Sequence, residues 1–337
     1  VSSEYDAKEQ TYTLNFSQYC RPTAECKDKQ PHLIPVALGL LGDAGALPIS
    51  IRGVAPNPDT DDNTKTVLEI TDAKQSVVFE NLREEPVPSL LRGFSAPVKW
   101  QYNYSRDDLM RLMANDDDGF NRWDAAQKLA SQVIQEVMAA MVNEPAPKVD
   151  ERLIEAYRTI LSDESLDPAM VALMLNLPSE AYLAEQETVV DVDSIHHARN
   201  RVERKISQAL HTELLSTYQR LHQVREFSIA PDEIARRILK NTALSYLMVG
   251  AKSDAVALCR EQFNTATNMS DELQAFTSIV HSGKSGLDEV KTECIAQFFD
   301  KWQAESLVMN SWFAVQASAP LPGVIEKVKG LSEHPAF

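Results

Sequence analysis

Two histidines one helical turn apart, with a glutamate between them, would form a zinc peptidase centre, because both imidazoles reach one metal ion and the glutamate handles the attacking water. No such H-E-x-x-H run occurs among the 337 residues. In the nearest run, His211-Thr212-Glu213, the outer positions point roughly 200° apart around a helix. The neighbours His196 and His197 diverge by roughly 100°, and His222 lies three turns beyond His211. We therefore expect histidines on helix surfaces or between helices, with no metal ligand among them.

The four cysteines are too few and too scattered for a disulfide framework, which favours a reducing, cytoplasmic compartment. They are Cys20, Cys26, Cys259 and Cys294. Cys20 and Cys26 lack both the tight spacing and the second pair of a zinc knuckle. We expect free thiols there, with a local disulfide under oxidation as the alternative. Cys259 and Cys294 have no cationic cluster nearby that would lower a thiol pKa, and we expect them to pack between helices.

Three further runs are similar to binding loops without completing one. Ser282-Gly283-Lys284-Ser285 ends like a phosphate loop, but Ser278 stands where the first glycine is needed, so a helix–helix turn is expected. The run Asn115-Asp116-Asp117-Asp118-Gly119 is similar to half a calcium loop whose twelfth position is alanine instead of glutamate. Helix capping by Asp118 explains it. The acidic stretch 59–63 is expected to be a solvated loop, and no G-x-S-x-G elbow occurs.

Composition excludes several classes of protein. The chain has 49 acidic and 33 basic side chains, so its net charge is −16, and nucleic acid and anionic membrane surfaces would repel it. No apolar run approaches the roughly 18 residues of a membrane span. At 44% hydrophobic content, 337 residues suffice for two or three domains with cores of their own. Without a catalytic motif, the sequence favours a scaffold over a catalyst.

The first third of the chain has the pattern of short β-strands. β-Branched and aromatic residues alternate or cluster in runs that turn-forming residues separate. The runs cover residues 12–19, 33–41, 66–70, 75–82, 90–94 and 98–104, and the chain opens at Val1 on a sequence ready to enter a strand. With no helical period between them, they predict a small antiparallel β-sandwich of the immunoglobulin-like kind over residues 1–105. Pro35 predicts an edge strand or a bulge.

After Ser105 the apolar period changes to that of helices. Residues from Trp123 to Met141 form one apolar stripe, and a similar stripe spans 153–161. A third apolar stripe predicts one long helix over 195–214. Pro168 and Pro231 occupy positions that open helices, and Gly250 is expected to end one as a left-handed cap.

Roughly ten helices follow one another in residues 106–337, with no strand-like run of any length and no fixed-period repeat. They predict an all-α superhelical domain of the ARM/HEAT type, because each helix pair has an apolar face that only a neighbouring pair can bury. The tail 331–337 carries no closing amphipathic helix, so we expect this domain to be truncated at its carboxy end. The opening Val1, which is not Met, leaves open a processed chain or a piece of something longer.

Five unbroken segments resemble one family. They read PVPSLLRGFSAPVK at 86–99, FNRWDAAQ at 120–127, NMSD at 268–271, DKW at 300–302 and LVMNSWF at 307–313. In order and spacing they resemble the carboxy-terminal portion of bacterial aminopeptidase N, the alanyl aminopeptidase family of gluzincin zinc peptidases. The resemblance covers the chain from Val1 to Phe337.

The resemblance implies an enzyme of four parts: an amino-terminal β domain, a thermolysin-like catalytic domain with the zinc motif, a β-sandwich and a helical superhelix. This chain is similar to the third part and most of the fourth. The family's zinc ligands, general base and transition-state tyrosine would lie upstream of Val1. No catalytic, cofactor-binding or metal-binding residue is therefore expected here, and the zinc would belong to the parent enzyme.

The resemblance favours a spacer and cover that encloses the active-site chamber of a peptide-degrading, cytoplasmic aminopeptidase and restricts peptide access. Its partners would be the catalytic domain of the same polypeptide and peptide substrates, in a monomer that binds neither nucleic acid nor membrane. One alternative is an independent helical solenoid that binds other proteins. The other is a stand-alone enzyme built from dispersed side chains such as His211, His222 and Cys259.

Overall fold

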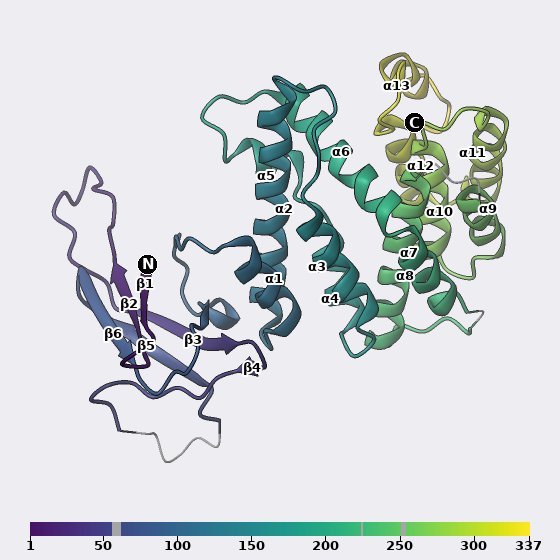
Figure 1. Ribbon diagram of the computed structural model, residues 1–337. Coiled ribbons are helices and arrows are strands. Elements are labelled where there is room, and N and C mark those ends of the chain that lie inside the picture. Colours follow the sequence, from purple (N-terminus) through teal and green to yellow (C-terminus); the bar gives the residue numbers. More distant parts are fainter. Residues whose placement is uncertain (56–61, 224, 251–253) are drawn as a thin grey trace. The chain divides into compact units, whose positions relative to one another are not determined.

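The computed structural model describes residues 1–55, 62–223, 225–250 and 254–337 (Figure 1). Its contacts divide into two compact units. The first comprises Val1–Val133 and Asp150–Ile160, and the second comprises Ile134–Val149 and Leu161–Phe337. The first unit therefore contains all the strands together with the first helices.

Two antiparallel sheets form the amino-terminal part, as predicted. The first has the order β1-β2-β6, and the second has the order β4-β3-β5 with β7 also paired to β3. The strands are β1 (Ser2–Asp6), β2 (Thr11–Ser17), β3 (Ile34–Gly42), β4 (Gly45–Ala46), β5 (Lys65–Ile70), β6 (Lys74–Phe79) and β7 (Val87–Leu90). Alternate residues of β2, namely Tyr12, Leu14 and Phe16, are buried. They pack with Leu38, Leu40 and other residues of the second sheet into one core, as the period-two pattern requires.

The strand expected at 90–94 is wrong, because the chain turns there. Leu91, Gly93 and Phe94 have φ of 56°, 58° and 56°, a left-handed conformation that no strand contains. A short 3-10 helix, Arg92–Phe94, occupies the position. Next to it, the Ser95 hydroxyl accepts from the Ala37 amide at 3.0 Å and donates to the Pro35 carbonyl at 3.0 Å.

Two other strand predictions also need correction. The expected strand at 98–104 belongs to neither sheet; its alternating aromatic residues Trp100 and Tyr102 pack against the sandwich core without a partner strand for the backbone. The edge-strand prediction at Pro35 holds only locally, because β3 as a whole is the central strand of its sheet. The proline is tolerated because β7 pairs only with residues 38–41 of β3, which leaves β5 as the single partner strand at Pro35.

From Arg106 onward the described chain contains helices and no strand. They are α1 (Arg106–Asn115), α2 (Gly119–Met141), α3 (Glu151–Ser162), α4 (Pro168–Leu175), α5 (Glu180–Ala184), α6 (Val192–Ala209), α7 (His211–Leu221), α8 (Pro231–Val249), α9 (Asp254–Thr265), α10 (Met269–His281), α11 (Asp288–Trp302), α12 (Ser306–Ala317) and α13 (Val324–Ser332). Pro168 and Pro231 open α4 and α8, as predicted. None of the helices in the described part of the chain combines the length and apolar character that crossing a bilayer requires.

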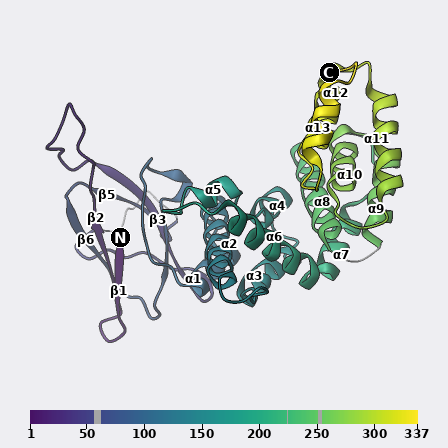
Figure 2. The same cartoon turned by 90° about the horizontal axis from the view of Figure 1, so that it is seen from above.

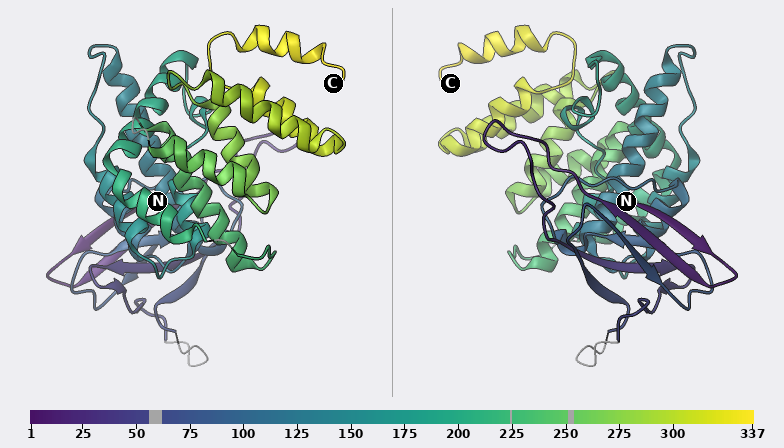
Figure 3. Two further views of the ribbon diagram at one scale, coloured as in Figure 1. Left: turned by 90° about the vertical axis from the view of Figure 1, so that its right-hand side faces the viewer. Right: turned by 90° about the vertical axis from the view of Figure 1, so that its left-hand side faces the viewer.

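In the second unit, helices close in sequence pack side by side (Figure 2). The pairs α7–α8, α9–α10 and α11–α12 are in contact, and α10 also contacts α8. The last helix, α13, packs against α12 and is drawn in yellow in Figure 3. Each helix thus buries its apolar stripe on a neighbour.

Two helix predictions in this unit are wrong. The long helix over 195–214 is broken at Leu210, whose φ and ψ of −107° and 18° separate α6 from α7. Gly250 does not adopt the left-handed conformation, since its φ is −65° and its ψ 164°. A glycine is needed there for space, because an added Cβ would lie 2.7 Å from Ser207 Oγ.

Candidate functional site

The connection between α1 and α2 brings three consecutive aspartates to the edge of the sandwich. Asp118 Oδ1 accepts a hydrogen bond from the Asn121 amide at 2.9 Å and so caps α2, which confirms the predicted capping role. Asp116 Oδ1 accepts from the Asp118 amide at 2.9 Å. These bonds close the turn and fix the directions of the carboxylates.

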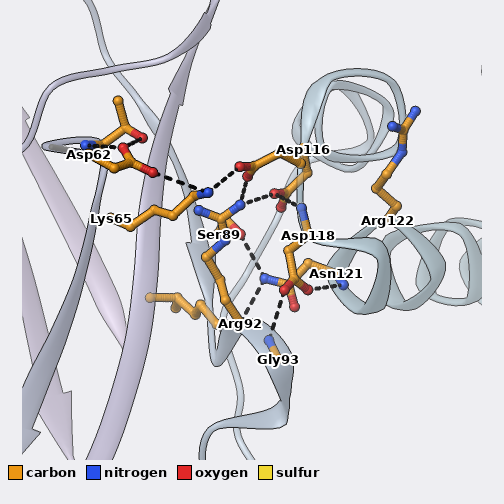
Figure 4. A network of polar contacts seen from close by, with 12 residues as sticks. Asp62, Lys65, Ser89, Arg92, Gly93, Asp116, Asp118, Asn121 and Arg122 are labelled. Atoms are coloured by element: carbon orange, nitrogen blue, oxygen red, sulfur yellow. Dashed lines mark hydrogen bonds and ion pairs between the residues drawn. The ribbon is translucent and has the colours of Figure 1, made fainter. Parts of the chain in front are cut away.

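Arg92 and Gly93, just after β7, contact all three aspartates. Figure 4 shows Arg92 and Gly93 beside Asp116 and Asp118. Arg92 Nη2 donates to Asp116 Oδ1 at 2.9 Å, and the Arg92 guanidinium also forms an ion pair with Asp117. The Gly93 amide donates to Asp118 Oδ2 at 2.9 Å. The left-handed turn at 91–94 explains this geometry, because it points the Arg92 side chain and the Gly93 amide toward the same helix connection.

The Arg92–Asp116 pair is largely removed from solvent, with side chains 10% and 0% exposed. Burial raises the pKa of Asp116, while hydrogen bonds from Ser89 and Asp118 and the charge of Arg92 oppose that rise. Lys65 of β5 adds a second cation, 2.7 Å from Asp117 Oδ2 and 3.2 Å from Asp62 Oδ2. Two cations of the sandwich therefore face the aspartates of the helix connection.

Asn121, in the first turn of α2, binds β7 directly. Its Nδ2 donates to Ser89 Oγ at 2.7 Å and to the Leu90 carbonyl at 3.0 Å. Both Asn121 and Ser89 are buried. A side-chain amide is needed here, since only two donors on one nitrogen satisfy both acceptors. We refer to Lys65, Arg92, Asp116, Asp117, Asp118 and Asn121 as the junction cluster.

The residues beside Asn121 complete the connection. Arg122 Nε donates to the Met113 carbonyl at 2.8 Å and Nη2 to the Ala114 carbonyl at 3.0 Å, which satisfies acceptors that the end of α1 leaves without partners. Phe120 packs edge-on against Phe94 with ring centroids 5.5 Å apart, and Trp123 lies 5.8 Å from Phe120. The FNRW run that carries the family resemblance thus builds the attachment of α2 to the sandwich.

The segment 98–104 forms a second attachment between the sandwich and α2. Tyr104 donates from its hydroxyl to the Pro88 carbonyl at 2.6 Å, and burial raises the pKa of Tyr104 well above its usual range. Lys128 Nζ of α2 lies 3.8 Å from the centroid of the Trp100 ring and 2.7 Å from Asp124 Oδ2. Both attachments lie inside the first compact unit.

The histidines considered as metal ligands lie on or between helices, as expected. His196 Nδ1 is 2.8 Å from Glu180 Oε1 of α5, and its ring meets that of His197 at 5.8 Å. His211 Nε2 lies 3.5 Å from Asp254 Oδ2 at the start of α9. His222 follows the last residue of α7 and stacks on Tyr218 at 5.0 Å. In the part of the chain that the structure describes, no three His, Cys, Asp or Glu side chains gather as a metal site would require.

The remaining sequence candidates are distributed through both units. Cys20 and Cys26 are free and exposed, while Cys259 and Cys294 are buried on α9 and α11. Cys259 Sγ lies 3.3 Å from the Ala275 carbonyl. Residues 282–285 connect α10 to α11, which confirms the predicted turn. Of the acidic stretch 59–63, positions 59–61 lie outside the described residues.

The junction cluster was not predicted as a unit. The sequence predicts Asp118 as a helix cap, and the family resemblance includes the segments around Arg92 and Asn121. No sequence pattern indicates that these residues contact one another. The available signal was the co-occurrence of an isolated arginine in a Gly-containing turn and a run of three aspartates before a helix. The charges of this cluster are paired with one another, which suits a mechanical attachment between two elements.

Comparison with known proteins identifies relatives over the whole chain. Residues 1–103 match a family described as a domain of unknown function, DUF3458, with an Ig-like fold. Residues 106–337 match DUF3458_C, a domain of unknown function described as ARM repeats. These descriptions confirm the predicted fold class.

The relatives are peptidases. Aminopeptidase N of Escherichia coli (strain K12) is 35% identical over 338 residues, and that of Haemophilus influenzae is 31% identical over 337 residues. Each match covers 100% of this chain but only 37% of the relative. A crystal structure of Legionella pneumophila aminopeptidase A in complex with aspartic acid matches with a TM-score of 0.79 and 25% identity, over 99% of this chain and 37% of that one. The chain therefore spans 37% of the length of these relatives.

Proposed function

This chain belongs to the DUF3458_C family of ARM-repeat domains and is homologous to the C-terminal region of bacterial aminopeptidase N, and from that membership we propose that it is the non-catalytic spacer and cover of a zinc-dependent aminopeptidase. The parent enzyme removes amino-terminal residues from peptides. The sandwich, residues 1–105, holds the helical domain, residues 106–337, at a fixed place over the catalytic part of the same polypeptide. The helices then limit access to short or unfolded peptides and keep substrate close to the zinc.

The observation that carries this proposal is the buried junction cluster. A spacer transmits position only if its attachment to the next domain is rigid. The Arg92–Asp116 pair, the Gly93–Asp118 bond and the Asn121 clamp on β7 join the two elements through side chains of both. Such buried hydrogen bonds and ion pairs fix one arrangement more strongly than exposed ion pairs do.

The side chains of this chain do not fit the zinc of the proposed parent. The described residues bring together no group of three His, Cys, Asp or Glu side chains, and the histidines with close partners use them for contacts within the helical region, as His196 does with Glu180. We assign no catalytic step to any residue here. The proposed parent is a cytoplasmic monomer that acts on peptides and binds neither nucleic acid nor membranes.

The proposal is tested by loosening the junction in the full-length parent enzyme. Asn121→Ala and Arg92→Met should raise the hydrolysis of long peptides relative to that of an alanyl arylamide, because the cover would no longer be held in one position. Zinc content should stay unchanged. The matched control is Arg111→Gln, which breaks an ion pair between α1 and Asp43 in which the Asp43 side chain is 79% exposed. An unchanged ratio of long to short substrates in both junction variants would contradict the proposed role.

A further inference from the structure

A groove of about 600 Å³ lies among α6, α8 and α10 within the second compact unit. Its volume lies in the range of small-molecule sites and exceeds that of a single amino acid side chain. Polar and charged groups from all three helices line it, and none of them belongs to the junction cluster. We refer to it as the α6–α8–α10 groove.

Glu203 places a poorly compensated negative charge in this groove. Its ion-pair partner among the described residues is Arg199, at the long distance of 3.6 Å between Nη1 and Oε2. Burial raises the pKa of Glu203, and the charges of Arg199 and Arg204 oppose that rise only in part. A cation delivered by a ligand would supply the missing compensation.

Positive charge stands beside Glu203 in the same groove. Arg204 follows Glu203 on α6, and its Nε donates a hydrogen bond to the Asn200 carbonyl at 3.2 Å. The two terminal nitrogens of its guanidinium have the geometry that binds a carboxylate. Lys284, just after α10, adds a second ammonium group to the lining. Burial lowers the pKa of Lys284, which means that an incoming anion would stabilise its charged form.

Neutral acceptors complete the polar lining. Gln274 Nε2 donates to Ser245 Oγ at 2.8 Å and Ser278 Oγ at 3.2 Å, which fixes the amide and leaves its oxygen as an acceptor. His281 Nε2 lies 2.8 Å from the Val315 carbonyl. Because a carbonyl only accepts, Nε2 carries the proton and Nδ1 is left as an acceptor. Both oxygen and nitrogen acceptors suit an ammonium group.

The groove also has an apolar part. Met248 and Val249 of α8 and Pro320 and Leu321 after α12 line it. Polar groups of both charges beside an apolar wall match a molecule that carries an ammonium group, a carboxylate and a hydrocarbon side chain.

We propose that the α6–α8–α10 groove binds a zwitterionic ligand, a free α-amino acid or a short peptide with an apolar side chain, whose ammonium group contacts Glu203 and whose carboxylate contacts Arg204. This site goes beyond the proposed spacer and cover role and does not depend on it, because the binding is a property of this chain alone. A negative result for ligand binding would therefore not contradict the spacer and cover role, and the reverse also holds.

The test is isothermal titration calorimetry on the 337-residue chain. L-leucine and L-leucyl-L-leucine carry both charges, leucinamide carries only the ammonium group, and N-acetyl-L-leucine carries only the carboxylate. At least one zwitterion should bind saturably with a Kd of about 1 mM or tighter, and the tighter of the two identifies the source as amino acid or peptide. Each single-charge analogue should bind about 10-fold more weakly or worse. Absence of saturable binding by both zwitterions, or equal binding of the analogues, would overturn the proposal.

Two variants assign the two charges. Glu203→Gln should weaken leucine about 10-fold and leave N-acetyl-L-leucine unaffected, whereas Arg204→Gln should weaken leucine and leave leucinamide unaffected. Glu289→Gln, which removes an exposed carboxylate of α11 outside the groove, is the charge-matched control and should bind leucine as the original chain does. Variants that fold, by circular dichroism, and keep the original affinity for leucine would contradict the assignment.

Discussion

Arg92 Nη2 lies 2.9 Å from Asp116 Oδ1 at the boundary between the sandwich and the helices, and both side chains are shielded from solvent. Breaking this pair from one side leaves a buried charge. We expect Arg92→Met to lower the free energy of unfolding by about 3 kcal/mol, because Asp116 loses its cation. Arg92→Met/Asp116→Asn should recover most of that loss, because it removes the charge and keeps an oxygen that accepts from the Asp118 amide. Urea unfolding measures both. Arg111→Gln, at an exposed ion pair, should cost no more than about 1 kcal/mol. A double variant as unstable as the single one would contradict this account of the pair.

Asn121 should be sensitive to truncation because two buried acceptors depend on its amide. We expect Asn121→Ala to lower the free energy of unfolding by about 2 kcal/mol, since Ser89 and the Leu90 carbonyl lose their donor. Asn143→Ala, at an exposed position after α2, serves as the control and should change stability by less than about 0.5 kcal/mol. Equal effects of the two changes would show that the clamp on β7 contributes nothing.

Substitutions at Gly250 and Ser207 test whether the glycine is needed because there is no room for a Cβ. We expect Gly250→Ala to destabilise the chain by about 1–3 kcal/mol, because the new methyl group would lie 2.7 Å from Ser207 Oγ, which hydrogen-bonds the Tyr246 carbonyl. Gly250→Ala/Ser207→Ala should be more stable than the sum of the two single changes predicts. Thermal unfolding of the four proteins completes this cycle. Strict additivity would show that Ser207 does not limit the space at Gly250.

The thiols should fall into two classes. Burial raises the pKa of Cys259 to about 12 and that of Cys294 to about 11, whereas Cys20 and Cys26 are exposed. Because the thiolate is the reactive form, a disulfide reagent should titrate two thiols rapidly in the native chain and all four in denaturant. Cys20→Ser/Cys26→Ser should abolish the rapid phase. Rapid reaction of Cys259 or Cys294 in the folded chain would contradict their burial.

His222 should make stability depend on pH. Burial, and next to it the charge of Lys240, lowers its pKa below the ordinary value, so the unfolded chain takes up this proton more readily. The contribution of neutral His222 to the free energy of unfolding is therefore complete above a pH of about 6.5. It is lost as the pH falls below that value toward the lowered pKa of the folded chain. We expect His222→Phe to keep the stack on Tyr218 and to reduce the loss of stability between pH 7 and pH 5. An unchanged pH slope in urea unfolding would argue against this residue as the source.

Local rules account for what the sequence predicted correctly. Asp118 caps α2, Pro168 and Pro231 open their helices, and residues 282–285 form a turn, because each depends only on neighbours along the chain. The same local rules did not predict the break between α6 and α7 at Leu210. Leu210 and Leu214 are both buried, so the apolar stripe continues in phase across a change in backbone direction.

Tertiary contacts account for what the sequence did not predict. The role of Gly250 depends on Ser207, which reaches it from a different helix. The segment 98–104 has an alternating pattern suited to a strand, but its aromatic side chains pack on the core while its backbone finds no partner strand. The Arg92–Asp116 pair joins residues 24 positions apart, and neither local pattern specifies the other.

We propose that this chain supports an aminopeptidase without carrying its chemistry. The most direct measurement is the zinc content of the purified 337-residue chain, together with its rate of alanyl arylamide hydrolysis, beside the full-length parent under the same conditions. We expect zinc and chelator-sensitive turnover in the parent and neither in this chain. Stoichiometric zinc in the 337-residue chain, with turnover that a chelator abolishes, would contradict the account.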